Sequence, residues 1–173
     1  MEEARVLAAI RRLAESGTPV LVAIDGRCAA GKTTLADRWG AEFGWSVVHL
    51  DDFFLRPEQR TPQRYAAPGE NVDHERFLDQ VLKPLRAGRE PVYQPFDCRA
   101  MALAEAKTLP LAPVVLAEGS YACHPELWDW YDLRLFVTVD PDRQLRRILA
   151  RNGPEAARVF QDRWIPLEER YFA

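Results

Sequence analysis

The residues with the clearest chemical signature form a glycine-rich stretch at residues 26–33. The stretch fits the pattern GxxxxGK[ST] and, with the residue that follows it, reads Gly26-Arg27-Cys28-Ala29-Ala30-Gly31-Lys32-Thr33-Thr34. Glycines at both ends let the backbone curl so that its N–H groups face the oxygens of a phosphate chain. In such loops the lysine reaches the β- and γ-phosphates, and the hydroxyl after it binds magnesium. The sequence therefore predicts an ATP and Mg²⁺ site over residues 26–34, with Lys32 and Thr33 in these two roles.

Carboxylates follow two of the apolar runs that read as strands. Asp51 and Asp52 come after residues 46–50, and Glu118 comes directly after residues 114–117. Ligands of open α/β sheets bind outside the carboxyl ends of the strands, which is also where the glycine-rich loop belongs. Glu118 is placed to hold Mg²⁺ through water, and Asp51 to accept a proton from an attacking hydroxyl. Taken alone, two aspartates after a strand are equally well explained by a helix cap or a solvated turn.

The elements that would position these residues alternate along the chain. Buried strands are predicted over residues 20–24, 46–50, 114–117 and 133–139, and helices over residues 2–16, 32–43 and 73–87. The polar, proline-containing residues 56–71 predict a long loop over the substrate, called the flap below, rather than an element. Unbroken apolar strands between helices are typical of parallel sheets covered on both faces. We therefore expect an α/β, doubly wound parallel sheet with helices on both faces.

Two further segments modify this sheet. Val92–Phe96 and Thr108–Leu111 predict the arms of a small antiparallel insertion at about residues 89–111. The last 22 residues are helical in pattern and arginine-rich, with Gly153 and Pro154 as a hinge, and a lid is expected at about residues 143–160. At 173 residues the chain has the size of one domain, which we expect to span residues 1–173.

Composition excludes several classes of partner. Lysine and arginine number 23 against 26 aspartates and glutamates, so the net charge of -3 offers no broad cationic surface for nucleic acid. No apolar run approaches the roughly 20 residues of a membrane span. The three cysteines form no CxxC pair, and His74 and His124 are isolated from any His/Cys cluster, so no disulfide framework or zinc site is expected. We expect a cytoplasmic protein and leave the oligomeric state open, a homo-oligomer included.

Further motifs accompany the glycine-rich loop, and they read Asp51-Asp52-Phe53-Phe54, Asn71-Val72-Asp73-His74, Pro91-Val92-Tyr93 and Glu118-Gly119. Over nearly the whole chain the set resembles P-loop kinases of the uridine kinase-like type, a group related to phosphoribulokinase and bacterial pantothenate kinase. The first two motifs resemble that family's Asp-Ser-Phe-Tyr and Asn-Phe-Asp-His. The resemblance implies Asp51 as catalytic base, Asp73 as a ligand of substrate hydroxyls, Tyr93 in the acceptor pocket, and Arg147 and Arg151 as lid arginines that clasp the phosphates.

Each of these implied roles has a plainer alternative. Asp73 also fits a helix N-cap, Tyr93 fits the core of the insertion, and Arg147 and Arg151, four residues apart, fit a solvated helix face. The chain also departs from the family in three ways. No histidine lies on the insertion, where Cys98 is nearest to its place, and Phe54 replaces a tyrosine on the acceptor side. The family's last apolar strand after the lid is not found either.

The sequence thus favours an ATP-dependent kinase that transfers the γ-phosphoryl group to a hydroxyl of a small nucleoside-like or polyhydroxylated metabolite. A kinase of the same fold with a non-nucleoside acceptor, pantothenate-like or sugar, is the first alternative, and the missing histidine favours it. A catalytically silent ATP-binding module is the second alternative, from another class. The chain has no Asn-Lys-x-Asp motif of the kind with which GTPase switches read their base.

Overall fold

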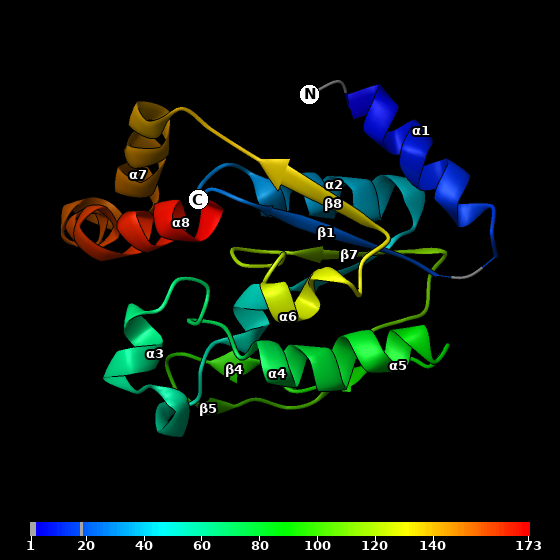
Figure 1. Ribbon diagram of the computed structural model, residues 1–173, viewed down its shortest axis with the longest axis horizontal. Coiled ribbons are helices and arrows are strands. Elements are labelled where there is room, and N and C mark those ends of the chain that lie inside the picture. Colours follow the sequence, from blue (N-terminus) through cyan, green and yellow to red (C-terminus); the bar gives the residue numbers. More distant parts are fainter. Residues whose placement is uncertain (1–2, 18) are drawn as a thin grey trace.

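A parallel sheet lies at the centre of the computed structural model, which describes residues 3–17 and 19–173 (Figure 1). Its strand order is β2-β7-β1-β8, and every neighbouring pair is parallel. The strands are β1 (Val20–Gly26), β2 (Ser46–His49), β7 (Val114–Glu118) and β8 (Leu133–Val137). The central strands β7 and β1 are buried along their whole length because helices cover both faces of the sheet, as the unbroken apolar runs predict. The four predicted strands are confirmed in place and in type.

The fourth strand differs from its prediction in burial. The sequence predicts a strand buried on both faces over residues 133–139, whereas β8 is shorter and lies at the edge of the described sheet. Leu135 is buried, but Phe136 is 50% exposed. An apolar run has the same appearance at the edge and in the centre of a sheet, so the pattern could not reveal the strand's position.

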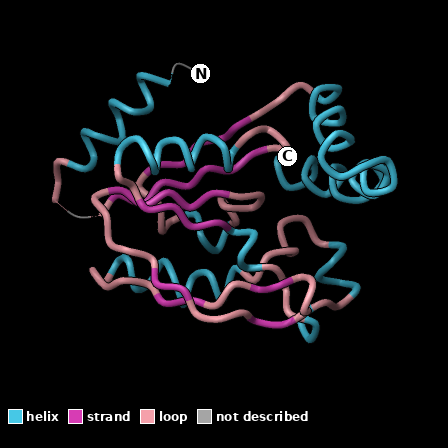
Figure 2. The backbone as a smooth tube through the Cα atoms, turned by 180° about the vertical axis from the view of Figure 1, so that it is seen from behind, coloured by secondary structure: helices cyan, strands magenta, loops and turns pink. Residues whose placement is uncertain are grey.

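Helices cover both faces of the sheet and lie above and below it in the ribbon of Figure 1 and in the tube of Figure 2. Helices α1 (Glu3–Ala14) and α2 (Lys32–Phe43) pack on one face, where Ile10 and Trp39 are fully buried. The other face carries α4 (His74–Phe77), a π-helical turn (Leu78–Leu82), α5 (Lys83–Arg86) and α6 (Pro125–Trp128). The doubly wound α/β prediction is therefore confirmed. Residue 2, part of the predicted first helix, lies outside the described residues.

The flap contains more regular structure than predicted. A 3₁₀ turn (Pro57–Gln59) and the short helix α3 (Pro62–Ala66) lie within residues 56–71, so the prediction of a loop without elements is wrong. Thr61 accepts a hydrogen bond from the Arg64 backbone N–H, and Pro62 occupies the first helical position. A threonine cap followed by proline is a local helix-start signal, and one turn of helix suffices to express it.

The insertion and the C-terminal region complete the fold. Strand β3 (Val92–Tyr93) pairs antiparallel with β6 (Lys107–Thr108), and β4 (Phe96–Asp97) pairs antiparallel with β5 (Ala102–Leu103). The predicted antiparallel insertion is thus confirmed. Helix α7 (Pro141–Val159) breaks at Gly153, whose φ of 81° is non-helical, and a π-helical turn (Phe160–Trp164) leads into α8 (Ile165–Phe172). The helix is therefore kinked where the sequence predicts a hinge, at Gly153 and Pro154, and movement about this point stays a prediction.

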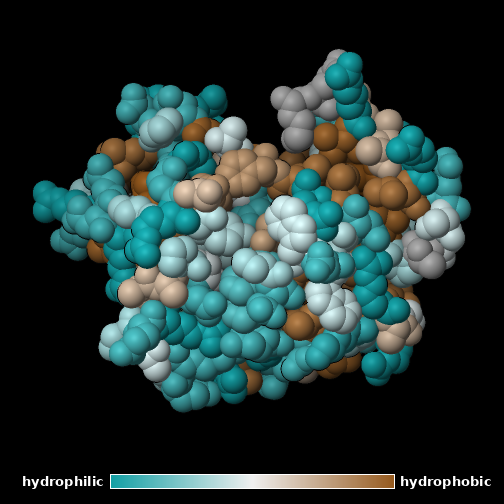
Figure 3. Space-filling model, viewed as in Figure 1, coloured by the Kyte–Doolittle hydropathy of each residue, from teal (hydrophilic) through white to brown (hydrophobic). Residues whose placement is uncertain are grey.

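The surface of the described residues is largely hydrophilic in the view of Figure 3, with hydrophobic side chains gathered beside α1. None of the helices formed by these residues is long and apolar enough to cross a membrane.

Candidate active site

The glycine-rich loop joins the end of β1 to the start of α2 and takes a shape that only its glycines allow. Gly26 has a φ of +132°, and a Cβ atom there would lie 2.0 Å from the Val137 carbonyl oxygen. Gly31 has a φ of +99° at the start of α2. The Lys32 ammonium lies inside the loop and donates to the carbonyl oxygens of Gly26 at 2.7 Å and of Arg27 at 3.0 Å. A cation is thus held where the loop's N–H groups and the N-terminus of α2 favour phosphate.

A buried aspartate anchors the loop from below. Asp25 is 1% exposed, and its carboxylate accepts hydrogen bonds from the backbone N–H groups of Gly26, Tyr121 and Cys123 and from the Tyr171 hydroxyl. Burial raises the pKa of Asp25, while these hydrogen bonds act in the opposite direction. The sequence reasoning missed Asp25, although an acid at the end of a buried apolar run was a visible signal.

The predicted magnesium ligands lie together at the strand ends. The Thr33 hydroxyl is 3.1 Å and 3.2 Å from the two carboxylate oxygens of Glu118, which is 3% exposed at the end of β7. A hydroxyl and a carboxylate are the hard oxygen ligands that suit Mg²⁺. His49 Nδ1 lies 2.6 Å from Glu118 Oε1, and this hydrogen bond raises the pKa of His49. The residue pair named from the sequence therefore has the chemistry of a magnesium site.

Of the two neighbouring aspartates, only Asp51 lines the main cavity of about 920 Å³ beside the loop. Although its side chain stays accessible from the cavity, enclosure by protein raises the pKa of Asp51, and the charge of Glu118 raises it further. Asp52 instead accepts a hydrogen bond from the Tyr93 hydroxyl at 3.1 Å and lies 3.4 Å from the Lys107 ammonium. The position of Asp51 is the one that the predicted base requires, and its role stays a prediction.

Three more predicted residues line the same cavity. Phe54 contributes an apolar wall, and Arg147 and Arg151 reach the glycine-rich loop from α7. Arg147 Nη1 donates to the Ala29 carbonyl oxygen at 2.9 Å, and Arg151 Nη2 lies 3.9 Å from Cys28 Sγ. The two arginines thus face the loop rather than bulk solvent alone.

Two predicted acceptor residues lie outside the cavity wall. Asp73 is 1% exposed, caps α4 by accepting the Arg76 backbone N–H at 3.1 Å, and pairs with the guanidinium groups of Arg56 and Arg76. Tyr93 stacks on Phe53 at a ring-centroid distance of 5.1 Å. These are the contacts of a helix cap and of an insertion core, the alternatives left open above. Their roles toward an acceptor stay predictions.

The C-terminal helix contributes a residue that the sequence did not indicate. Glu168 in α8 is 3% exposed, accepts the Cys28 backbone N–H of the loop at 2.7 Å, and accepts the Gln144 side-chain amide at 3.2 Å. Burial raises the pKa of Glu168. The adjacent Glu169 forms an ion pair with Arg27. A carboxylate therefore accepts the hydrogen bond of one loop N–H group that a phosphate would otherwise accept.

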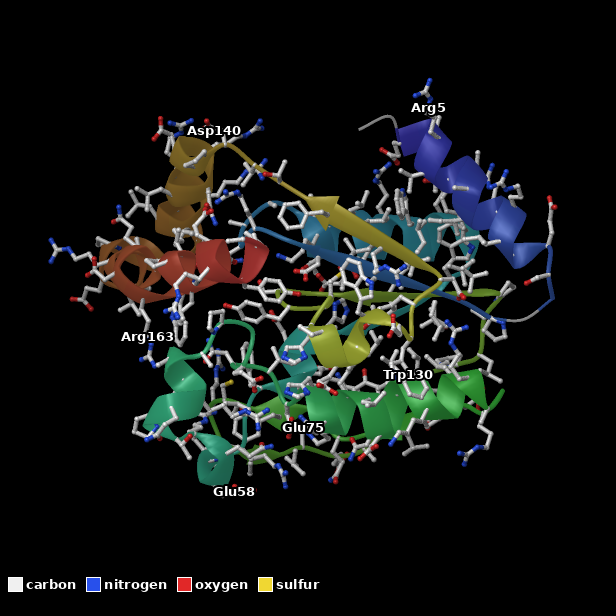
Figure 4. All side chains as sticks on the ribbon, in the orientation of Figure 1. Arg5, Glu58, Glu75, Trp130, Asp140 and Arg163 are labelled. Carbon is white, nitrogen blue, oxygen red and sulfur yellow. The ribbon has the colours of Figure 1, made fainter. Side chains whose placement is uncertain are left out.

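The flap and the C-terminal helices meet across the cavity. The Arg163 guanidinium carbon lies 4.9 Å from the ring centroid of Tyr65 in α3 and 4.5 Å from that of Trp164. Figure 4 shows Arg163 between α3 and the C-terminal helices. Tyr65 and Trp164 both line the cavity, so this contact, called the flap–lid contact below, joins the flap to the π-helical turn that follows α7 at the cavity wall.

The two histidines predicted to be isolated are in fact neighbours. The rings of His74 and His124 stack at 3.9 Å, and each Nε2 atom lies 3.3 Å from a different carboxylate oxygen of Glu70. His124 Nδ1 accepts the Glu126 backbone N–H, so in the neutral ring Nε2 carries the proton and donates to Glu70. That nitrogen then has no lone pair for a metal ion, and the cluster is a hydrogen-bonded bridge between the flap and α6.

In sequence, the chain is similar to known kinases. The chain is 27% identical over 154 residues to uridine-cytidine kinase A of Dictyostelium discoideum, an alignment that covers 83% of the chain and 30% of that protein. It is 28% identical over 146 residues to the uridine kinase of Chlamydia pneumoniae, with 79% of the chain and 65% of that protein covered. The chain thus spans between about a third and two thirds of the length of these relatives. No protein-family model matches it.

Among solved structures, D-glycerate 3-kinase from Cryptococcus neoformans var. grubii superposes with a TM-score of 0.66 at 17% identity, over 95% of this chain and 84% of that one. The glycine-rich loop, the strand order and this superposition define the class as a P-loop protein with a kinase fold. The sequence relatives then confirm the particular resemblance predicted from the motifs, to P-loop kinases of the uridine kinase-like type.

Proposed function

We propose that the chain transfers the γ-phosphoryl group of ATP to a hydroxyl group of a small molecule. The observation that carries this proposal is the contact of 3.1 Å between the Thr33 hydroxyl and the Glu118 carboxylate. It places two oxygen ligands suited to Mg²⁺ beside a phosphate-binding loop, with Asp51 on the wall of the same cavity. The sequence relatives are named as kinases, which supports the same reaction.

In this proposal the protein acts mainly by positioning charge. The loop N–H groups and the Lys32 ammonium bind the β- and γ-phosphates, and Lys32 exchanges its two carbonyl partners for phosphate oxygens. Thr33 and Glu118 would hold Mg²⁺, which when bound neutralises charge on the phosphates. Arg147 and Arg151 add positive charge from the other side of the loop. Charge developing in the transition state is thereby stabilised in a partly enclosed cavity.

Asp51 is the proposed general base. It accepts the proton of the acceptor hydroxyl as that oxygen attacks the γ-phosphorus, and the bond between this phosphorus and the departing ADP oxygen breaks. A raised pKa makes Asp51 a stronger base than an ordinary aspartate, which suits it to accept this proton. A silent ATP binder would not need a carboxylate at this place, so Asp51 favours the kinase over that alternative.

The acceptor is a small polyhydroxylated molecule, and a non-nucleoside is the second candidate beside a nucleoside. The described residues that line the cavity include no histidine; Cys98 of the insertion and the apolar Phe54 are there instead. A buried pyrimidine edge needs polar partners, so this lining favours the non-nucleoside. The three unpaired cysteines support the reducing, cytoplasmic location expected from the sequence.

The proposal is tested by incubating the purified chain with Mg²⁺ and either ATP or GTP and a panel of nucleosides, vitamins and sugars. ADP release and ³¹P NMR of the product are measured together, so that hydrolysis is distinguished from transfer. A phosphorylated acceptor is the expected result. Without any transfer, and without measurable MgATP binding in calorimetry, the proposed function is wrong.

A further inference from the structure

The acceptor side of the main cavity is formed by the flap and the insertion. Its wall includes the apolar side chains of Phe54, Leu55 and Val72 and the polar side chains of Arg60, Asn71 and Cys98. Asp51 lines the same cavity, and Cys98 lies near enough to both Asp51 and Arg60 to feel their charges. A molecule whose hydroxyl faces Asp51 can therefore extend along this wall toward Arg60.

Asn71, on the same wall, has a carboxamide without a hydrogen-bond partner among the described residues. It is 9% exposed, and neither its amide nitrogen nor its amide oxygen has a hydrogen-bond partner. The Tyr121 hydroxyl is near the carboxamide but outside the geometry of a hydrogen bond. Buried side-chain amides in native proteins are nearly always paired, but both Asn71 amide atoms are shielded from solvent, so a ligand in the cavity would reach them only if the side chain turned.

Arg60 is a cation without a negative partner. It forms no ion pair with any described residue, whereas Arg56, Arg64 and Arg76, its neighbours in sequence or space, each pair with carboxylates. Among the described residues that line the cavity, it is the one cation that the flap and the insertion supply.

The Arg60 side chain is nevertheless held in place. Its Nε donates to the Leu55 carbonyl oxygen at 2.8 Å, and its guanidinium carbon lies 5.2 Å from the centroid of the Phe96 ring. An arginine that is oriented by a carbonyl and an aromatic ring, yet lacks an anion, is preorganised to bind one.

We propose that the acceptor is a small hydroxy acid, whose carboxylate binds Arg60 and whose hydroxyl is directed to Asp51. This inference rests on the proposed kinase activity and names its substrate class. The hydroxyl oxygen forms a bond to the γ-phosphorus, the bond from this phosphorus to ADP breaks, and the hydroxyl proton passes to Asp51. A single arginine fits a carboxylate, whereas phosphate groups are usually bound by clusters of cations.

The test uses acceptors in matched pairs that differ in the carboxylate. D-Glycerate is compared with glycerol, gluconate with glucose, and pantothenate with panthenol, beside uridine and ribose 5-phosphate, and kcat/KM is measured for each. We expect one acid to exceed its neutral partner by at least about 100-fold, as for a site built around a charged contact. In Arg60→Gln this preference should fall to within about 10-fold, mainly through KM, and Arg60→Lys should restore part of it. Arg99→Gln, on the exposed part of the insertion, is the matched control and should leave the preference unchanged.

The possible outcomes distinguish the hydroxy-acid inference from the proposed kinase function. If uridine, ribose 5-phosphate or a neutral partner is preferred, and Arg60→Gln does not change the ranking, the hydroxy-acid inference is wrong while the kinase proposal stands. If no panel compound accepts phosphate, thermal shifts with a non-hydrolysable ATP analogue decide. An acid that stabilises the parent protein and not Arg60→Gln supports the inference, and the absence of any such acid refutes it. A parent protein that does not bind the analogue refutes the proposed function itself.

Discussion

Replacing Asp51 with asparagine separates a kinase from a protein that only binds ATP. The substitution keeps the size and shape of the side chain on the cavity wall and removes its capacity to accept a proton. The loop N–H groups, Lys32 and the Thr33–Glu118 pair are untouched, so MgATP should still bind. We therefore expect phosphoryl transfer to fall while nucleotide affinity changes little.

The size of the effect follows from the environment of Asp51. A positioned general base contributes about 10²- to 10⁴-fold in rate, and we expect a loss in that range. Asp52→Asn is the matched control, because Asp52 lies off the cavity and contacts Tyr93 and Lys107. Neither of these contacts faces the cavity, so the rate in Asp52→Asn should stay close to that of the parent protein.

The pH profile provides a second readout. Enclosure and the charge of Glu118 raise the pKa of Asp51, and below this pKa the base is protonated and inactive. The acid limb of kcat/KM should therefore lie above the ordinary aspartate range and should be absent in Asp51→Asn. The assay measures coupled ADP release from about pH 4 to pH 9, with calorimetry for MgATP. A large loss in Asp52→Asn with an unchanged rate in Asp51→Asn would show that Asp52, and not Asp51, is the base.

Further predictions concern the loop and its anchors. Lys32→Ala should lower kcat by about 10²- to 10³-fold in steady-state assays, because a charged contact to the transferring phosphates is lost, with the circular dichroism spectrum unchanged; an unaltered kcat would refute the phosphate site. Glu168→Gln should lower the Kd for MgATP several-fold in calorimetry, because the carboxylate competes with phosphate for the Cys28 N–H, and an unchanged or higher Kd would contradict this. In urea unfolding, Gly26→Ala should lower the free energy of unfolding by at least about 2 kcal/mol, because the added Cβ atom clashes with Val137. Gly88→Ala, which has open space around it, is the control and should lower it by about 1 kcal/mol. Equal losses in the two variants would contradict the close approach of Gly26 to Val137.

The sequence predicted the parts of the fold that depend on local pattern. The apolar run at residues 20–24, the glycine-rich loop and the helix over residues 32–43 are consecutive and reinforce one another, so strand, turn and helix could be placed together. The pairing of Thr33 with Glu118 was also within reach, because parallel strands bring their carboxyl ends to one edge of the sheet.

The remaining features depend on packing between distant segments. Glu168 reaches the Cys28 N–H across 140 residues of chain, and no periodicity relates the two positions. His74 and His124 stack because the start of α4 meets the start of α6, although neither has a motif near it that indicates a partner. The edge position of β8 depends on strand order, which the apolar pattern does not encode. The helix α3 is a different case, since its threonine and proline signal was local and readable.

The flap–lid contact has a thermodynamic consequence. Arg163 holds the ring of Tyr65 from the acceptor side and the ring of Trp164 from the C-terminal helices, so order imposed on one side is passed to the other. We therefore expect the two substrates to bind cooperatively. Linkage requires that the factor by which MgATP changes acceptor affinity equals the factor by which the acceptor changes MgATP affinity. A single pair of cation–π contacts would thus make each substrate an effector of the other.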